Sequence, residues 1–384
     1  MTEFCPTLVR TVCLGVVMAT ANAEAVQGQG HAHLTPSLTT AEEYDSNVFA
    51  TASDPEADFV TRASLGLDVD YSGPRWTAST QYLHELERFN DHPRLNSADA
   101  RQRAAVSVGY QPTGRTTWAA DGEFWKTRTP GELNESTGLI LTRATAERMA
   151  AHSSLRHRLN LVTSATIDYT ATQDHVAGRP QATTQDTSAT IERRHSPRTT
   201  FTLDYRFRDF VFATPGSTAV SDVVSHAITA GWTRVLTPRV QLTIGGGPRM
   251  TNASVSPEVS ASLQYHTHSG EFSMSYVRTQ ATVIGLASVA ETQSVGVATA
   301  WSLWSSMRVR LAPTFFRSDV EGARADAWVL MADLSRPLTR GLDLNLSVNS
   351  SMQHGGLNLS GPSSAIARHV VLLRLVAGSS SSLR

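Results

Sequence analysis

The sequence predicts an all-β chain, a transmembrane outer-membrane β-barrel of about 16–18 antiparallel strands. Apolar and polar residues alternate along many segments, most clearly at residues 65–71, 201–208 and 342–349. This period is typical of strands with one apolar and one polar face. Tight turns alternate with longer polar loops along the chain, as they do in barrels that cross a membrane. The first 23 residues have the features of an export signal.

The composition favours an exported β protein and excludes other classes. The chain has 384 residues with 33 Lys and Arg against 34 Asp and Glu, a formal net charge of −1. It therefore lacks the basic excess expected of a nucleic-acid-binding protein. Charged residues make up only 17% of the chain, whereas about a quarter is usual. Thr and Ser take many of the places that Lys and Glu would occupy, which favours strands with a polar but mostly uncharged face.

The N-terminal segment predicts a signal peptide at residues 1–23. Arg10 precedes a short apolar stretch at residues 12–19, and small residues at 21 and 23 suit cleavage after Ala23. The apolar stretch is too short to be a permanent transmembrane helix. The only two cysteines, Cys5 and Cys13, lie in this segment, so we expect a mature chain without thiol or disulfide chemistry.

The rest of the chain predicts one domain. We assign a signal peptide to residues 1–23, an N-terminal periplasmic spacer to 24–40, a β-barrel to 41–378 and a Ser-rich C-terminal tail to 379–384. A soluble β-propeller also repeats at about 40 residues. A propeller blade needs four short strands, however, and each repeat here offers two long ones.

Turn signals set the expected strand count. Shorter alternating stretches occur at residues 106–110, 240–244, 259–265 and 307–311. Tight Gly, Pro, Ser and Asn turns are predicted at 72–74, 112–114, 157–160, 195–197, 236–238, 268–270, 305–306 and 336–341. Longer polar loops are predicted at 90–99, 129–135, 173–185, 213–222, 317–324 and 350–363. With a first strand at 41–49 and a last at 366–376, the turns give about eighteen strands. Residues 139–157 could follow a helical period, and we predict strand there.

Aromatic residues gather beside the tight turns. Most share the apolar face of their strand, as in the aromatic girdle at one bilayer interface. Aromatic residues are also common beside hairpin turns for other reasons. The predicted girdle residues are Tyr71, Trp76, Tyr110, Trp118, Phe201, Trp232, Tyr265, Phe272 and Trp301.

The polar strand faces predict a lumen of mixed charge. A barrel of about eighteen strands is too wide to be filled by its wall side chains alone. Four arginines are on these faces, Arg206, Arg208, Arg308 and Arg310. They could form a cationic ladder for anionic solutes or sugar acids, or pair with nearby carboxylates. The predicted lumen-lining residues are Asp68, Asp70, Asp121, Glu123, Asp168, Glu192, Asp204, Arg206, Arg208, Arg308, Arg310 and Asp343.

The sequence does not single out a catalytic or metal site. There is no Gly-x-Ser-x-Gly motif, and no spacing marks a nucleophile, so we predict no enzyme and no cofactor. His266 and His268 could ligate a metal from one strand face, but no third ligand is marked, and solvent-facing histidines beside a turn are the simpler interpretation. No helical pattern follows residues 245–247, so these three glycines indicate a bulge or bend.

The segment that contains Tyr44, Asp45, Asn47, Val48 and Phe49 resembles the opening of the first strand in porin-2-like outer-membrane barrels associated with exopolysaccharide export loci. The resemblance extends loosely over the mature chain. It implies both chain ends in the periplasm and a conduit through which a polysaccharide leaves the cell. Many outer-membrane proteins end on an aromatic residue, whereas this chain runs into a Ser-rich tail that ends in Arg384.

These observations predict a monomeric channel in the cell outer membrane of a Gram-negative bacterium. The expected contacts are outer-membrane lipid and lipopolysaccharide, and the resemblance adds a polysaccharide and a periplasmic export partner. A general diffusion porin for small polar solutes is the first alternative, and it should show an inward-folded loop with opposed acidic and basic clusters. We expect no such loop, because none is rich in charge. A barrel enzyme or a closed structural barrel would also fit the sequence.

Overall fold

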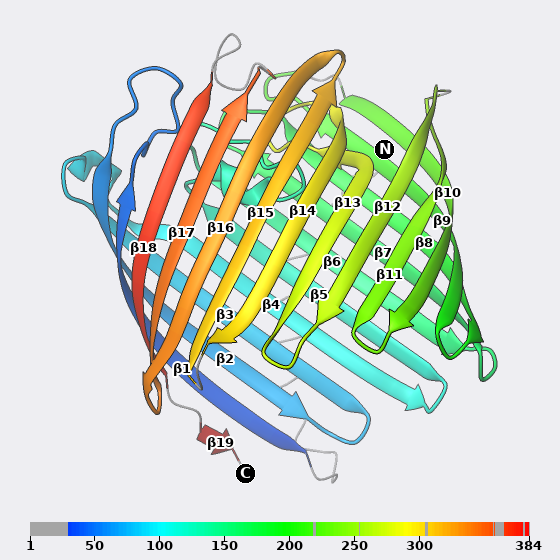
Figure 1. The fold of residues 1–384 in the computed structure, drawn as a ribbon. Coiled ribbons are helices and arrows are strands. Elements are labelled where there is room, and N and C mark those ends of the chain that lie inside the picture. Colours follow the sequence, from blue (N-terminus) through cyan, green and yellow to red (C-terminus); the bar gives the residue numbers. More distant parts are fainter. Residues whose placement is uncertain are drawn as a thin grey trace.

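The computed structural model describes residues 30–217, 220–252, 254–303, 306–355, 357, 365–378 and 381–383. In these residues, consecutive strands pair antiparallel from β1 to β18, and β18 pairs with β1 (Figure 1). The eighteen long strands thus close into a barrel, which confirms the predicted fold class. The predicted signal peptide, with Cys5 and Cys13, lies outside the described residues.

The first nine strands are β1 (His31–Asp45), β2 (Asp58–Ser72), β3 (Trp76–Phe89), β4 (Ser97–Thr113), β5 (Thr116–Thr127), β6 (Ala146–Arg158), β7 (Thr163–Val176), β8 (Gln181–Ser196) and β9 (Thr199–Ala213). The others are β10 (Val220–Thr237), β11 (Val240–Thr251), β12 (Ser254–His266), β13 (Gly270–Thr282), β14 (Val289–Leu303), β15 (Met307–Val320), β16 (Ala323–Thr339), β17 (Leu342–His354), β18 (Ile366–Gly378) and the short β19 (Ser381–Leu383). Two 3₁₀ turns, η2 (Pro93–Leu95) and η3 (Pro130–Leu133), lie in loops. No helix in the described part of the chain is long and apolar enough to cross a membrane.

The two ends of the barrel differ in their connections. The predicted tight turns overlap the eight short connections from β2–β3 to β16–β17, which share one end, here called the short-turn end. The opposite, long-loop end carries the long connections at residues 46–57 and 128–145. Of the loop predicted at 350–363, the first residues belong to β17, which continues to His354, and most of the others lie outside the described residues. Long loops predicted at 173–185 and 317–324 are wrong, because strands continue to Val176 and Val320 there. Polar residues at these positions lie on strand ends rather than in loops.

Strand pairing extends beyond the predicted barrel bounds in both directions along the chain. β1 begins at His31 and pairs with β2 from that residue on, so residues 31–40 belong to the barrel and not to a spacer. Pro36, which has no N–H, lies between the residues of β1 that pair with β18 and those that pair with β19, as expected for a proline in a strand. In the predicted tail, Ser381–Leu383 pair with residues 32–34 of β1. The strand predicted within 139–157 is confirmed for residues 146–157 of β6.

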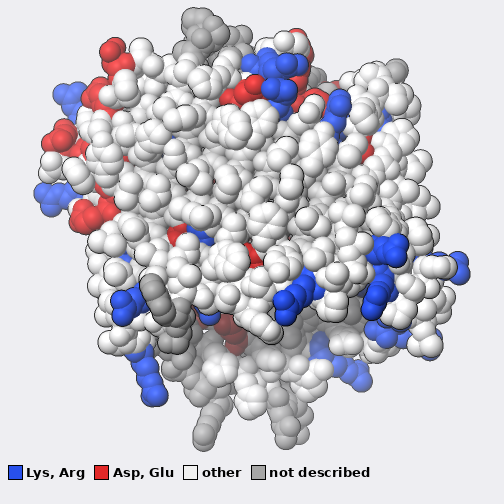
Figure 2. Space-filling model, in the orientation of Figure 1, with Lys and Arg blue, Asp and Glu red and all other residues white. Residues whose placement is uncertain are grey.

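The outward face of the barrel is apolar. Directly paired residues share a face, and Leu65, Ile167 and Leu203 are each more than half exposed. Figure 2 shows that charged side chains gather mainly toward the two ends of the wall. An exposed apolar band between polar ends is the surface expected of a barrel in a bilayer.

All nine predicted girdle residues lie on the outward face near the short-turn end. Trp76 and Tyr110 stack with their ring centroids 4.0 Å apart. Toward the long-loop end, two further outward pairs, Tyr44 with Phe59 and Phe315 with Trp328, have centroids 5.3 and 4.7 Å apart. These pairs were not predicted. Together the two sets are placed where a bilayer would have its two interfaces.

The motif at residues 44–49 lies where the barrel closes. The Asp45 carboxylate is buried and accepts hydrogen bonds from the Arg368 guanidinium of β18 at 2.7 and 3.1 Å. The Asn47 side chain donates to the backbone oxygen of Ala367 at 3.1 Å. Val48 packs in a buried cluster with Val60 and Phe89. These residues therefore join the first strand to the last.

Removing one partner of this closing ion pair should destabilise the barrel. Arg368→Met leaves the Asp45 carboxylate buried without a counter-charge, so we expect the free energy of unfolding to fall by about 3 kcal/mol. The double variant Asp45→Leu/Arg368→Met buries no charge and should recover most of this loss. Urea unfolding of the protein in detergent micelles measures both. Equal losses in the single and double variants would contradict a buried ion pair.

Candidate functional site: a constriction in the lumen

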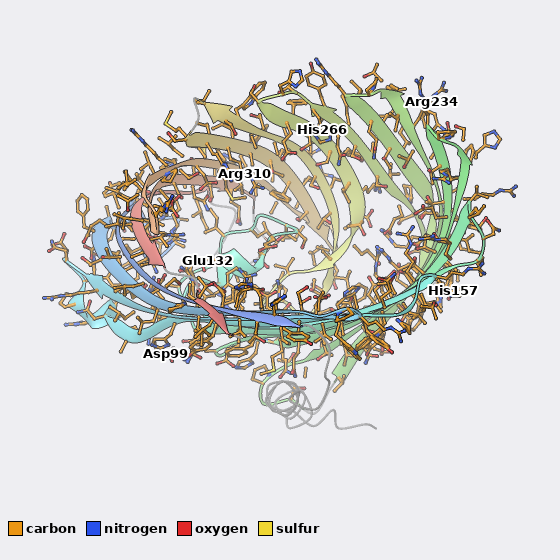
Figure 3. The ribbon with its side chains drawn as sticks, turned by 90° about the horizontal axis from the view of Figure 1, so that it is seen from below. Asp99, Glu132, His157, Arg234, His266 and Arg310 are labelled. Carbon is orange, nitrogen blue, oxygen red and sulfur yellow. The ribbon has the colours of Figure 1, made fainter. Side chains whose placement is uncertain are left out.

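The structure places all twelve predicted lumen residues on the inward face of the wall. Asp68 pairs across the strands with Thr35, Asp121 with His152 and Arg310 with Asp333, and each pair shares the inward side. In Figure 3, Glu132 lies within the lumen, whereas Asp99 and Arg234 lie outside the wall. The lumen wall therefore carries both signs of charge. Its role in solute passage stays a prediction.

The loop at residues 128–145 folds into the lumen rather than away from the barrel (Figure 3). Its 3₁₀ turn presents Glu132, which pairs with Arg101 of β4. Arg143, near the end of the loop, pairs with Glu87 of β3. Thr127 also donates to the Glu132 carboxylate, at 3.0 Å. Ionic contacts thus join the loop to the wall formed by β3 to β5.

A small apolar core holds the same loop from its other side. Leu133, Leu139 and Leu141 are almost completely buried, and they pack in a cluster with Val176 of β7 and Ile284. Burial of side chains of this size stabilises the inward position by about 1.5–3 kcal/mol each. The loop is therefore a packed element and not a loose cover.

Two side-chain amides complete the attachment. The Asn134 oxygen accepts a hydrogen bond from the backbone N–H of Ile284 at 3.0 Å. The Gln353 oxygen of β17 accepts one from the backbone N–H of Ile140 at 2.8 Å. These bonds satisfy backbone donors that the loop buries.

The expectation that no loop is suited to fold inward is wrong. The loop carries four charged residues, Arg128, Glu132, Glu135 and Arg143. Most of the opposing groups come from strands, such as Glu87, Arg101 and Arg368, which lie far from the loop in the sequence. Their position opposite the loop follows from strand register, which local composition does not show.

A buried ion cluster lines the wall beside the loop. The Arg62 guanidinium lies 2.9 Å from Glu43, 2.7 Å from Glu85 and 3.3 Å from Glu87. Three carboxylates around one cation leave net negative charge on β1 to β3. Arg101 and Arg143 contribute the additional positive charge that balances it.

The charge states of the loop groups follow from their partners. Burial opposes ionisation of Glu132, but the charge of Arg101 outweighs it and holds the Glu132 pKa below its usual value. Burial lowers the pKa of Arg143, and Glu87 opposes that change. An arginine stays protonated in proteins. Both loop groups are therefore charged at neutral pH.

A second element enters the lumen from the opposite wall. β12 pairs with β13 only between Val259 and His266, whereas β13 and β14 pair along the whole of β13. Val289 of β14 packs against Phe210 and Phe212 of β9. Residues 279–291, here called the arm, therefore leave the line of the wall and lie against the inner face of neighbouring strands.

Ion pairs fasten the arm. Arg249 of β11, whose side chain is fully buried, contacts both Glu258 and Glu291. Arg278 donates to Glu291 at 2.9 Å. Because Glu291 belongs to the arm and Arg249 to the wall, these contacts tie the arm to β11 and β12.

The four lumen arginines do not form one ladder. Arg208 lies 3.2 Å from Asp186 and 2.6 Å from Glu258, and Arg206 lies 3.6 Å from Asp186. These two arginines therefore pair with carboxylates. Arg308 and Arg310 lie at the short-turn end, and no ion pair to either occurs in the described residues.

A cavity of about 730 Å³ remains between the loop and the wall of β1–β5 and β15–β18. Its lining combines charged groups, among them Arg103, Glu135 and Arg374, with the apolar side chains of Phe316 and Met331. The loop also packs in one cluster with the arm and with Val320 and Ala325 at the ends of β15 and β16, so this cavity marks the space left beside the constriction.

The remaining sequence candidates have structural explanations. Exposed His266 lies 3.9 Å from Glu271, and the described residues contain no group of three or more side chains placed to hold a metal. The glycines at 245–247 lie in β11, where a Cβ on Gly247 would meet the Ile228 carbonyl oxygen at 1.9 Å. They allow a bend against β10, as predicted.

No family model and no curated protein matches this chain. Among solved structures, the chain is similar to Pseudomonas aeruginosa OpdQ, with 8% identity, a TM-score of 0.47, and 92% of this chain and 98% of the other covered. It is similar to Acinetobacter baumannii OccAB4, with 10% identity, a TM-score of 0.47, and 93% and 99% covered. It is also similar to the siderophore receptor PirA of Pseudomonas aeruginosa, with 10% identity, a TM-score of 0.44, and 90% and 80% covered.

Neutralising Glu291 should loosen the arm. Glu291→Gln removes the charge that faces Arg249 and Arg278, so the arm should open more often. We expect backbone hydrogens of residues 279–291 to exchange about ten-fold faster, which corresponds to about 1.4 kcal/mol. Hydrogen exchange read by mass spectrometry measures this, with Glu271→Gln, on β13 outside the arm, as the control. Unchanged protection in Glu291→Gln would mean that apolar packing alone holds the arm.

Proposed function

We propose that this protein is a channel in the outer membrane of a Gram-negative bacterium through which small polar solutes diffuse. The observation that carries the proposal is the inward-folded loop at residues 128–145, which narrows a wide lumen without filling it. Acidic and basic groups face each other there, Glu132 and Glu135 on the loop against arginines of the wall. Charged side chains at a constriction act on every solute that passes.

The proposal places the apolar band in contact with outer-membrane lipid and lipopolysaccharide, and treats the channel as a monomer. It needs no catalytic group, because diffusion needs only a water-filled path. The arrangement of ion pairs keeps the lumen wall polar and leaves space beside the loop.

A polysaccharide conduit is the finer function that the sequence resemblance implies. A polymer chain would have to pass beside the loop and the arm, both of which are packed into the lumen. The small-solute channel fits this narrowed lumen better, so we favour it. A closed structural barrel would differ by passing no current.

Single-channel recording in planar bilayers tests the proposal. We expect stable open currents, with neutral polyethylene glycols excluded above a small size. Leu139→Asp places a charge in the apolar core of the loop, which should expel the loop. Its current and its size limit should then rise. Asn134→Ala tests the same attachment more gently, and Asp209→Asn, on the outward face, is the control.

No current through a protein that folds as a barrel would contradict the proposal. So would a current that stays unchanged in both loop variants, because the loop would then not define the path.

A further inference from the structure

One of the arginines that line the cavity has no ion-pair partner in the described residues. Arg101, Arg103 and Arg368 each contact a carboxylate, of Glu85, Glu123 and Asp45 respectively. Arg374 of β18 also lines the cavity, and no hydrogen bond or ion pair to it occurs in the described residues. Its neighbours across the strands are Ala41 and Asn345, which carry no charge.

Arg374 therefore offers a free guanidinium to whatever enters the cavity. A guanidinium binds carboxylate and phosphate groups through two parallel hydrogen bonds. A partly enclosed cavity strengthens such an interaction relative to open water.

Apolar side chains line the cavity on strands close to β18. Phe316 of β15 and Val329 and Met331 of β16 face inward there. Met331 is 46% exposed although it lies on the polar side of its strand. Apolar side chains that a lumen wall leaves uncovered gain when an apolar part of a solute covers them.

Trp125 of β5 adds a second mixed surface. Its indole N–H is buried and has no hydrogen-bond acceptor in the described residues. The Arg103 guanidinium lies 5.1 Å from the centre of its ring. The ring of Trp125 thus adds apolar surface beside Arg103 to the lining of the cavity.

We infer that the cavity binds organic anions that have an apolar body, with Arg374 taking the anionic group and Val329 and Met331 the body. The inference rests on the proposed function in one respect, since it names the class of solute that the channel would favour. A cavity of about 730 Å³ lies within the usual range of small-molecule sites.

Arg308 and Arg310 also favour the binding of anions. Both face the lumen near the short-turn end and are without an ion-pair partner in the described part of the chain. Asp333 faces Arg310 across the strands, so the two arginines leave one net positive charge on this part of β15 and β16 to draw anions toward the cavity.

Four matched solutes separate charge from apolar body. Phenylacetate has both, acetate has the charge alone, phenylacetamide has the body alone, and phenethylammonium has the opposite charge. We expect phenylacetate to bind the protein in detergent micelles at least about ten-fold more tightly than the other three, measured by titration calorimetry. In bilayers, phenylacetate should also block the chloride current more strongly than the other three solutes do.

Two variants assign the parts of the site. Arg374→Gln should weaken phenylacetate binding about ten-fold and bring it close to that of phenylacetamide. Met331→Ser should weaken binding of phenylacetate and leave that of acetate unchanged. Arg234→Gln, on the outside of the wall (Figure 3), should change neither.

Equal binding of phenylacetate and acetate, or an Arg374→Gln variant with unchanged binding, would overturn the inference. The calorimetric measurement of binding does not depend on whether the protein conducts. Selective binding without current would support the site and contradict the channel, and current without selective binding would do the reverse.

Discussion

The need to pair every backbone N–H and C=O group shapes this whole structure. A strand that crosses a bilayer has no water to bind its polar groups, so each strand needs two neighbours and the sheet must close. Pairing of β1 with β18 provides that closure, and the Asp45–Arg368 contact holds it at one end. A closed ring of eighteen strands necessarily encloses a wide lumen. The ion pairs, the inward-folded loop and the arm all lie in that lumen.

The lumen is organised by buried charge. Arg62, Arg208 and Arg249 each face more than one carboxylate, and these contacts fix side chains that would otherwise extend into water. The same pairing positions the loop at residues 128–145 and the arm. The charged side chains that no ion pair holds, such as Arg374, are the ones that a passing solute meets. The proposed channel and the proposed anion site both depend on this balance.

Local pattern was enough to predict the barrel and its strand count. Alternation along residues 65–71 and the tight turn after Ser72 depend only on neighbouring residues, and both are present. The inward loop could not be predicted in this way. Its attachments join Asn134 to Ile284 and Ile140 to Gln353, pairs that only the strand register brings together. The arm was missed for the same reason, since β13 reads as an ordinary strand and leaves the wall through contacts with β9 and β11.

The central claim is that an open path runs beside the inward-folded loop. Glu135 lies on that loop, is exposed, and lines the cavity. The most direct measurement is the single-channel current of a Glu135→Cys variant before and after reaction with a bulky, water-soluble thiol reagent. The account predicts that the current falls abruptly on modification and returns when the mixed disulfide is reduced. A current that is insensitive to complete modification would contradict it, because the path of the ions would then not pass the loop.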